Sequence, residues 1–417
     1  MNEFQNLDIN WIDDSDDDDK EIFLKALYSY LHFKKDSLEI CDKIILKNPD
    51  FNAPKLLKII LILLTRDINK KKIAYEILKK INLDQINDHF KEYLIIISFW
   101  IKGDLHKVIE ELKKIISKYK KEILAVRLFH FNSIFIGIDG KFLENHQEIF
   151  GQWNKNDPFY NLILGMTSFA YEENNQLATA KNLAKESLDL SAKDLWSWHA
   201  LLHVQDNELS SDLDKNTQFL SIEWTKYGAI KRHIWWHQAL MHFYSKDYNA
   251  CLYMYDKYIF SEDEFYLDFC NTSSLLLRLH YKGINVEDRM YQLKPLANYF
   301  RNQHSLPFID YHLILFYKYF EDMEYFEKIE ENIINGYKHS GFEKVVTCYL
   351  KPVIKNFKNN TLINTKVLNN AFQSLGGSFA QREIIMLGLL ENTSNKSVKD
   401  KIKDIFRKKK STLVNYV

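Results

Sequence analysis

Residues that interrupt helices are scarce in this sequence, which holds only 6 prolines and 12 glycines among 417 residues. No stretch alternates apolar and polar residues as a half-buried strand does. Apolar residues instead recur at three- and four-residue steps, as in "YHLILFYKYF" at 311–320, which is the spacing of one face of a helix. The scarcity of helix breakers and this periodicity together predict an all-α fold.

Cysteine and net charge are scarce as well. The four cysteines, Cys41, Cys251, Cys270 and Cys348, are scattered and show no CxxC spacing, so we expect small buried side chains in a reducing compartment rather than disulfides or metal ligands. Lys+Arg and Asp+Glu each number 56. With no overall field to attract polyanions, we predict no nucleic-acid partner.

Long apolar runs are missing too. The longest, "IILILL" at 59–64 and "YLIIISFWI" at 93–101, fall far short of the ~20 residues that a membrane helix needs. The opening "MNEFQNLDINWIDDSDDDDK" has neither the basic nor the apolar region of a signal peptide. We therefore expect a cytoplasmic protein with no membrane partner.

The helical pattern is broken by short polar loops, which require consecutive helices to lie antiparallel, and it repeats about every 36 to 38 residues, close to the ~34 of tetratricopeptide repeats. The first (A) helix of each pair is expected to begin near Pro158, Asp194, Lys231, Leu267, Pro307, Glu343 and Ser378. The second (B) helix is expected near Gln176, Asp214, Tyr248, Asn285, Met323, Thr361 and Ser397. This register predicts an α-solenoid of antiparallel helix pairs, a TPR-like right-handed superhelix whose A helices line a concave groove.

Four segments follow from this pattern. Residues 1–20 form an acidic N-terminal segment, whose carboxylates suit the start of a helix. Residues 21–155 carry less regular helical repeats, and residues 156–395 carry the regular ones. Residues 396–417 form a C-terminal capping helix with a basic tail, where cations complement the helix dipole.

Six motifs stand in order along the chain: "DPFYNLILGMTSFAYEENN", "DLWSWHALLHVQD", "RHIWWHQALMHF", "NTSSLLLRLHYKG", "FIDYHLILF" and "LGGSFAQRE". Together they resemble the tetratricopeptide repeat protein 38 family over residues from about 35 to 391. The resemblance implies the helical-repeat fold and no assigned activity. This chain departs from the family motifs at Ile234, Asn271, Leu277, Phe379 and Glu383.

Conspicuous polar and aromatic residues of these motifs all fall on expected A helices, so we predict that they line the groove. They are His199, His203, His233, Trp236, His237, His242, Asn271, Arg278, Asp310, His312, Gln381 and Arg382. Residues at equivalent positions of successive repeats, such as His199, His237, Ser274 and His312, predict two polar stripes running along the groove.

Two histidine pairs have metal-ligand spacing. His199/His203 and His233/His237 are four residues apart, so each pair shares a helix face with Cβ atoms ~5–6 Å apart. Neutral imidazoles placed in this way can chelate zinc, but "HALLH" lacks the glutamate of the metalloprotease HExxH motif. We predict no metal or cofactor, and expect the histidines to form hydrogen bonds within the groove wall or to contact a ligand. The alternative is a transition metal bound by His199, His203 and His237.

Arg278 and Arg382 are the best candidates to bind an anion, since a guanidinium grips a carboxylate or phosphate at two points; intramolecular pairing is the alternative. "LGGS" at 375–378 lacks the spacing and lysine of a P-loop, and we expect Ser378 to cap a helix. The tryptophans of the motifs are expected to pack between helices, Trp235 more firmly than Trp236.

The predicted function is a binding or scaffold protein whose groove holds a peptide, a protein tail or a small anionic ligand. The alternative is a metal-dependent or histidine-based enzyme or small-molecule binder. The positions of the side chains distinguish the two functions, because a peptide-binding groove needs its side chains spaced along an open surface. The alternative needs His199, His203, His237 and His312 to converge in a closed pocket.

Overall fold

The computed structural model describes residues 4–13, 15–137, 140–208, 226–228, 230–359, 363, 372–409, 411 and 413. These residues form helices joined by loops, and the described part of the chain contains no β-strand beyond an isolated bridge between Lys34 and Tyr227. The prediction of an all-α fold is confirmed.

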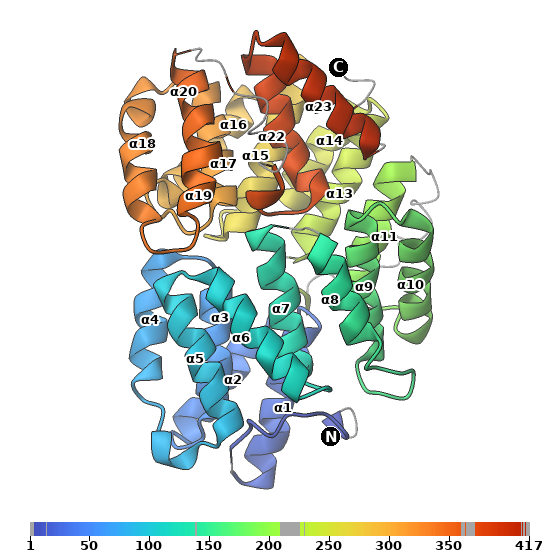
Figure 1. Ribbon diagram of the computed structural model, residues 1–417, viewed down its shortest axis with the longest axis vertical. Coiled ribbons are helices and arrows are strands. Elements are labelled where there is room, and N and C mark those ends of the chain that lie inside the picture. Colours follow the sequence, from blue (N-terminus) through green and yellow to red (C-terminus); the bar gives the residue numbers. More distant parts are fainter. Residues whose placement is uncertain are drawn as a thin grey trace.

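The first half of the chain contains helices that lie side by side in the lower part of Figure 1. They are α1 (Asp17–Leu31), α2 (Ser37–Lys47), α3 (Ala53–Leu64), α4 (Ile68–Leu78), α5 (Asp88–Lys102), α6 (Leu105–Lys118), α7 (Ile123–Ile136) and α8 (Gly140–Phe150). A short 3-10 turn at Leu83–Gln85 precedes α5. Asp16 caps α1 by accepting a hydrogen bond from the Asp19 backbone N–H, as expected for the acidic segment.

The second half supplies the helices that carry the motifs. They are α9 (Tyr160–Glu173), α10 (Leu177–Leu190), α11 (Leu195–Glu208), α13 (Ile230–Tyr244), α14 (Tyr248–Met254) with a π-helical turn (Tyr255–Ile259), α15 (Tyr266–His280), α16 (Glu287–Phe300), α17 (Pro307–Tyr319), α18 (Met323–Gly336), α19 (Glu343–Val345) with a π-helical turn (Val346–Leu350), α20 (Lys351–Asn359), α22 (Phe379–Asn392) and α23 (Lys396–Lys408). Every predicted start of a helix in this half that falls on described residues lies within two residues of the observed one. The expected starts near Asp214 and Thr361 lie outside the described residues.

Small residues allow α9, α10 and α11 to pack closely. Ala180, Ala184 and Ser187 of α10 are fully buried, and the Ser187 hydroxyl donates to the Asn161 carbonyl at 2.8 Å. On the other side of α9, a Cβ added at Gly165 would lie 2.4 Å from Ser197 Oγ of α11. This close approach fixes α11, which carries two of the motif histidines, against α9.

The predicted A helices are neighbours in space. Helix α11 packs against α9 and α13, and α15 packs against α13, α17 and α22. Near the centre of Figure 1, α22 lies beside α15 and α17. The start of α22 also reaches the first half of the chain, because Gly377 N–H donates to the Ile134 carbonyl of α7 at 2.9 Å. Helix α22 therefore packs on α15 and α17, and the residues just before it join the second half of the chain to α7.

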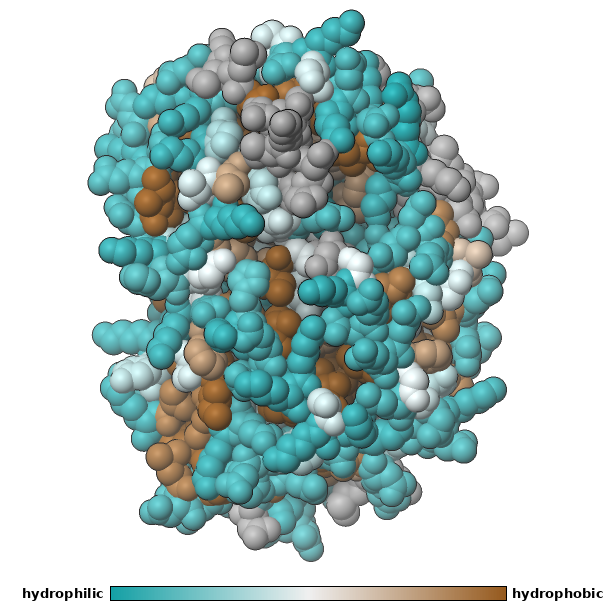
Figure 2. Space-filling view, viewed as in Figure 1, coloured by the Kyte–Doolittle hydropathy of each residue, from teal (hydrophilic) through white to brown (hydrophobic). Residues whose placement is uncertain are grey.

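All four cysteines are free. Cys41, Cys251 and Cys270 are buried as expected, whereas Cys348 is half-buried. Hydrophilic side chains cover most of the face in Figure 2, with separate apolar patches between them. Among the described helices, none has the length and apolar character needed to cross a membrane.

Candidate metal centre and adjoining cavity

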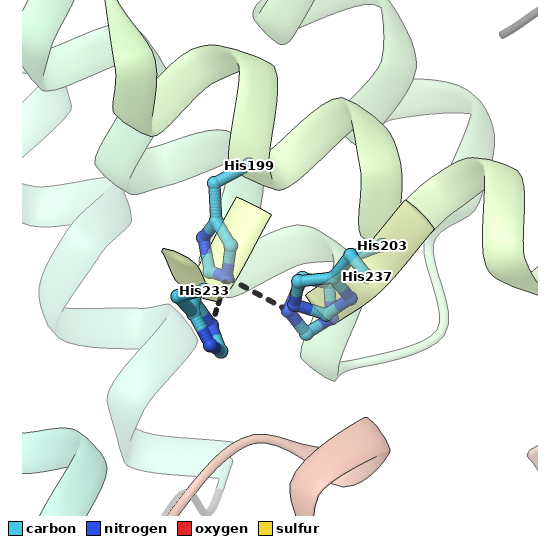
Figure 3. Close-up of side chains that lie close together, drawn as sticks. All are labelled: His199, His203, His233 and His237. Atoms are coloured by element: carbon cyan, nitrogen blue, oxygen red, sulfur yellow. Dashed lines mark hydrogen bonds between the residues drawn. The ribbon is translucent and has the colours of Figure 1, made fainter. Parts of the chain in front are cut away.

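Four histidine rings meet between α11 and α13. His199 and His203 come from α11, His233 and His237 come from α13, and one ring nitrogen of each lies within 4.8 Å of the others. Figure 3 shows the four rings facing one another. The Nε2 atom of His199 lies 2.9 Å from that of His233 and 3.1 Å from that of His203. All four side chains are buried.

Local interactions hold the two helices that carry these rings. Asp194 precedes α11 and accepts a hydrogen bond from the Trp196 backbone N–H at 3.1 Å, which caps the helix. Arg232 of α13 pairs with the buried Asp268 of α15 at 2.6 Å. Within each helix the four-residue spacing then brings both rings to the same side.

The outer nitrogens of two rings on α13 contact fixed oxygen atoms. His237 Nδ1 lies 3.0 Å from Asp206 Oδ2, and His233 Nδ1 lies 3.3 Å from Asn271 Oδ1. An amide oxygen accepts hydrogen bonds and donates none, so the contact with Asn271 places the ring proton of His233 on Nδ1, and an ionised Asp206 does the same for His237. The Nε2 atoms of both rings are then lone-pair donors that face the centre.

The same arrangement recurs on α11. His203 Nδ1 lies 3.3 Å from Glu172 Oε2 at the end of α9, which leaves His203 Nε2 facing His199. His237 Nε2 and His199 Nδ1 are buried, and neither has a hydrogen-bond partner among the described residues. The Nε2 atoms of His233 and His237 thus lie with those of His199 and His203 in one small volume.

Burial keeps the rings of His199, His233 and His237 neutral. It lowers the pKa of His199 and of His237 well below the usual value, and it lowers the pKa of His233 to about 3, with neighbouring histidines adding to each shift. Burial also raises the pKa of Asp206. A neutral imidazole is the form that binds metal ions, and a cation held by the rings would stabilise the ionised form of Asp206.

A cavity of about 280 Å³ adjoins the histidines, and His199 and His233 form part of its wall. Helices from both halves of the chain contribute the remaining wall. Most of the lining is apolar, and aromatic rings dominate it: Phe33, Phe131, Phe135, Phe169, Trp196 and Phe265. The cavity has the size and lining of a small-molecule site next to the histidine cluster.

Carboxylates gather on the other side of His203. Glu172, Glu173 and His203 form a second group whose ligand atoms lie within 4.8 Å of one another. Glu173, however, already pairs with Arg382 Nη2 at 3.1 Å and accepts the Phe379 backbone N–H at 2.7 Å. This second group is therefore a salt-bridged anchor for α22, and the four-histidine group is the better metal site.

The two arginines predicted to bind an anion in the groove have partners within the protein. Arg278 is fully buried, donates to the Ala380 carbonyl at 2.7 Å and lies 3.7 Å from Glu383. Arg382 donates to the Gly377 carbonyl and to Glu173. The structure thus shows intramolecular pairing, the alternative to anion binding, for both arginines.

The predicted stripes are also corrected, because His242 and His312 stand apart from the cluster. His242 is 41% exposed and lies 3.8 Å from Asp247. His312 is buried, but its Nδ1 donates to the Phe308 carbonyl at 2.8 Å one turn earlier. Asp310 accepts hydrogen bonds from His304 and Tyr337 and faces neither the histidines nor the cavity wall described above.

The remaining predicted residues support the centre. Trp236 is fully buried, stacks on His233 with ring centroids 5.4 Å apart and donates from Nε1 to Ser274 Oγ at 3.1 Å. Gln381 lines the cavity and completes the capping box with Ser378, which confirms the predicted cap. Trp235 is half-buried against Tyr258, with centroids 4.4 Å apart, so the expectation that Trp235 packs more firmly than Trp236 is wrong.

Sequence reasoning did not identify Asp206 or Glu172 as partners of the histidines. Asp206 stands three residues after His203 on the same helix, and that spacing was a usable signal. Glu172 lies in "EENNQ", which resembles a polar loop, yet the carboxylate is buried in the last turn of α9.

No protein-family model matches this chain.

Proposed function

We propose that this protein is a metal-dependent enzyme that holds one transition-metal ion with His199, His203, His233 and His237. The observation that carries the proposal is the convergence of four buried imidazole nitrogens within 4.8 Å. The expected convergence included His312, which lies apart, but the meeting of His199, His203 and His237 with His233 supports the enzyme or small-molecule alternative over a peptide groove.

Proton counting supports a cation at the centre. Each neutral imidazole has one N–H. The contacts of His233 with Asn271 and of His237 with an ionised Asp206 place that hydrogen on the outer nitrogen. His199 can then donate at most one hydrogen inward. Buried lone pairs that face each other without a proton repel and lack solvent, and a metal ion satisfies all of them together.

The four imidazole ligands limit which metal ions could bind here. Imidazole suits zinc, copper, iron and nickel, whereas calcium and magnesium prefer oxygen ligands. Hydrogen bonds from metal-binding histidines to carboxylates or carbonyls orient the rings and raise their basicity, and Asp206, Asn271 and Glu172 stand in that position. Neutral imidazoles do not offset the positive charge of a metal ion. The carboxylates of Asp206 and Glu172 would offset it.

The adjoining cavity favours a catalytic role. His199 and His233 belong both to the metal-binding set and to the cavity wall, so a molecule in the cavity lies beside the ion. An ion that prefers six ligands keeps two positions for such a molecule after binding four histidines. There it would act as a Lewis acid on a polar group of the substrate.

A closed structural zinc site is the second candidate, and the full burial of all four rings favours it. Tetrahedral zinc with four protein ligands has no position left for a substrate. Replacement by Co²⁺ separates the two cases, because closed tetrahedral cobalt gives strong visible absorption bands and six-coordinate cobalt gives weak ones. Bands that change when small molecules enter the cavity would favour catalysis.

We also propose that the scaffold is a TPR-like solenoid of the kind found in the tetratricopeptide repeat protein 38 family. The regular spacing of the helix starts from α9 onward and the contacts between successive A helices support this. Cytoplasmic location and a peptide or protein partner stay predictions.

Metal analysis of protein purified without a His tag tests the function. We expect close to one equivalent of a transition metal per chain in the wild type, and loss of that metal in His237→Ala. Two variants serve as controls: His242→Ala removes an exposed histidine, and His312→Asn removes a buried one outside the cluster. Both controls should keep the metal. Metal-free wild type that also fails to take up Zn²⁺, Fe²⁺, Cu²⁺ or Ni²⁺ would refute the proposal.

A further inference from the structure

One part of the cavity wall is polar although most of the lining is apolar. Arg66, Tyr30 and Tyr266 line the cavity together. The Tyr30 hydroxyl is buried and has no hydrogen-bond partner among the described residues. Tyr266 interacts with Arg66, whose positive charge lowers the pKa of the Tyr266 phenol against the larger opposing effect of burial. Two phenol groups thus accompany a guanidinium inside an aromatic cavity.

Arg66 carries a buried charge without a matching anion. Its side chain donates from Nη2 to Asn132 Oδ1 at 2.7 Å, while its Nε is buried and unpartnered within the described part of the chain. No described carboxylate forms an ion pair with it, and the guanidinium instead lies 5.2 Å from the Trp100 ring centroid and 5.6 Å from that of Phe135. Buried arginines are almost always paired, so this one is prepared for a partner that is not part of the protein.

The backbone sets where the Arg66 side chain leaves the helix. Arg66 follows the end of α3 with a φ of 57°, in the left-handed region, and its N–H donates to the Leu63 carbonyl at 3.2 Å. The same conformation ends other helices of this chain, as at Phe33, Lys246 and Glu321. This helix end therefore fixes the position of Arg66 in the cavity wall.

We propose that the cavity binds a small apolar monocarboxylate, with its carboxylate held by Arg66 and the Tyr30 hydroxyl and its apolar body packed between the aromatic rings. This proposal rests on the proposed function for one feature, which is that the bound acid lies beside the metal held by His199 and His233.

Charge and size define the ligand class. A single guanidinium and neutral phenols balance one negative charge, which matches a carboxylate better than a phosphate dianion. The cavity of about 280 Å³ has room for a short-chain or single-ring acid.

The test compares acids with alcohols of the same shape. Binding of 4-phenylbutyrate and octanoate, and of 4-phenylbutanol and octanol, is measured by calorimetry on the full chain after metal removal by a chelator. We expect each acid to bind ~10- to 100-fold more tightly than its alcohol, from the strength of hydrogen bonds to charged groups. Equal affinities for acid and alcohol, or no binding of any of the four compounds, would overturn the proposal.

Variants locate the carboxylate. Arg66→Gln should remove the preference for the acids and leave the affinity for the alcohols almost unchanged, and Tyr30→Phe should reduce the preference several-fold. The matched control is Arg301→Gln, because the Arg301 guanidinium also lies over aromatic rings, those of Tyr317 and Tyr325, but neither it nor these rings line the cavity. This control should keep the preference. If Arg66→Gln does not fold, Tyr30→Phe decides, and an unchanged acid preference in that variant contradicts the proposal.

A final measurement separates this proposal from the metal centre. Because the acid and alcohol comparison uses metal-free protein, its result stands whether or not metal analysis succeeds. In Co²⁺-loaded protein, NMR signals of bound 4-phenylbutyrate should broaden through the paramagnetic ion. Broadening supports both the acid site and its place beside the metal. Acid binding without broadening keeps the carboxylate site and refutes its contact with a metal centre.

Discussion

The contact between Asp206 and His237 gives the most specific prediction for the metal centre. Asp206 Oδ2 lies 3.0 Å from His237 Nδ1, and both side chains are buried. We consider Asp206→Asn, which keeps the shape of the side chain but removes its charge. The new amide group can donate to Nδ1 and so move the ring proton to Nε2, the nitrogen that would bind the metal.

The size of the effect follows from the role of such outer partners. Loss of a carboxylate behind a metal-binding histidine typically weakens metal affinity 10- to 100-fold, or about 1.4 to 2.7 kcal/mol. Glu172 and Asn271 still hold two other rings in this variant. We therefore expect weaker binding in Asp206→Asn with an unchanged stoichiometry of one ion per chain.

Competition with a chromophoric zinc chelator measures this affinity. The chain offers a matched control in Asp247→Asn, because Asp247 lies 3.8 Å from His242 in an exposed pair outside the cluster. That control should bind zinc as the wild type does. If Asp206→Asn binds zinc with wild-type affinity, Asp206 does not serve the centre, and the assignment of the inward nitrogens is wrong.

Three further predictions concern stability. Burial lowers the pKa of His312 to about 4, so between pH ~6.5 and ~4 the unfolded state binds a proton that the folded state does not. The free energy of unfolding, measured by urea denaturation, should therefore fall as the pH drops through this window, and it should fall less steeply in His312→Asn. Equal slopes in the wild type and the variant would contradict this prediction. Arg382→Met leaves the buried Glu173 unpaired and should cost about 3–5 kcal/mol in the same assay; a loss near zero would mean that the pair does not anchor α22. Gly376→Ala should lower the melting temperature more than Gly283→Ala, because φ is positive at both but only at Gly376 would the new Cβ lie 2.7 Å from a carbonyl oxygen of α7; equal shifts would refute the close approach.

The arrangement of helices in the second half could be predicted because its signals are local. Helix starts depend on caps and loop residues near each start, and the starts at Asp194 and Pro307 agree with α11 and α17. The repeat then placed the motif residues on neighbouring helices. The repeat pattern did not predict how each helix is rotated about its own axis. That rotation decides which histidines lie close together.

The site shows that difference clearly. The prediction aligned His199 with His237 and His312 at equivalent positions of different repeats, but the structure groups both residues of each i, i+4 pair and leaves His312 aside. Pairing within a helix is fixed by local geometry, whereas alignment over several repeats depends on the accumulated packing of all of them.

Long-range contacts account for the remaining differences. The salt bridge between Arg382 and Glu173 joins residues that are 209 positions apart, and a periodic pattern carries no signal for such a pair. Arg66 was hidden for the same reason. It lies in "RDINK", a polar break after an apolar helix, and only the packing of α3 against other helices turns that position into a cavity wall.

X-ray absorption at the metal edge tests the central claim most directly. For zinc-loaded protein we predict a first shell of nitrogen at ~2.0–2.1 Å, with the outer-shell scattering of about four imidazole rings. In His233→Ala the number of imidazoles should fall by one or the metal should be lost. A first shell made only of oxygen or sulfur, or the same imidazole count in the wild type and the variant, would contradict the account.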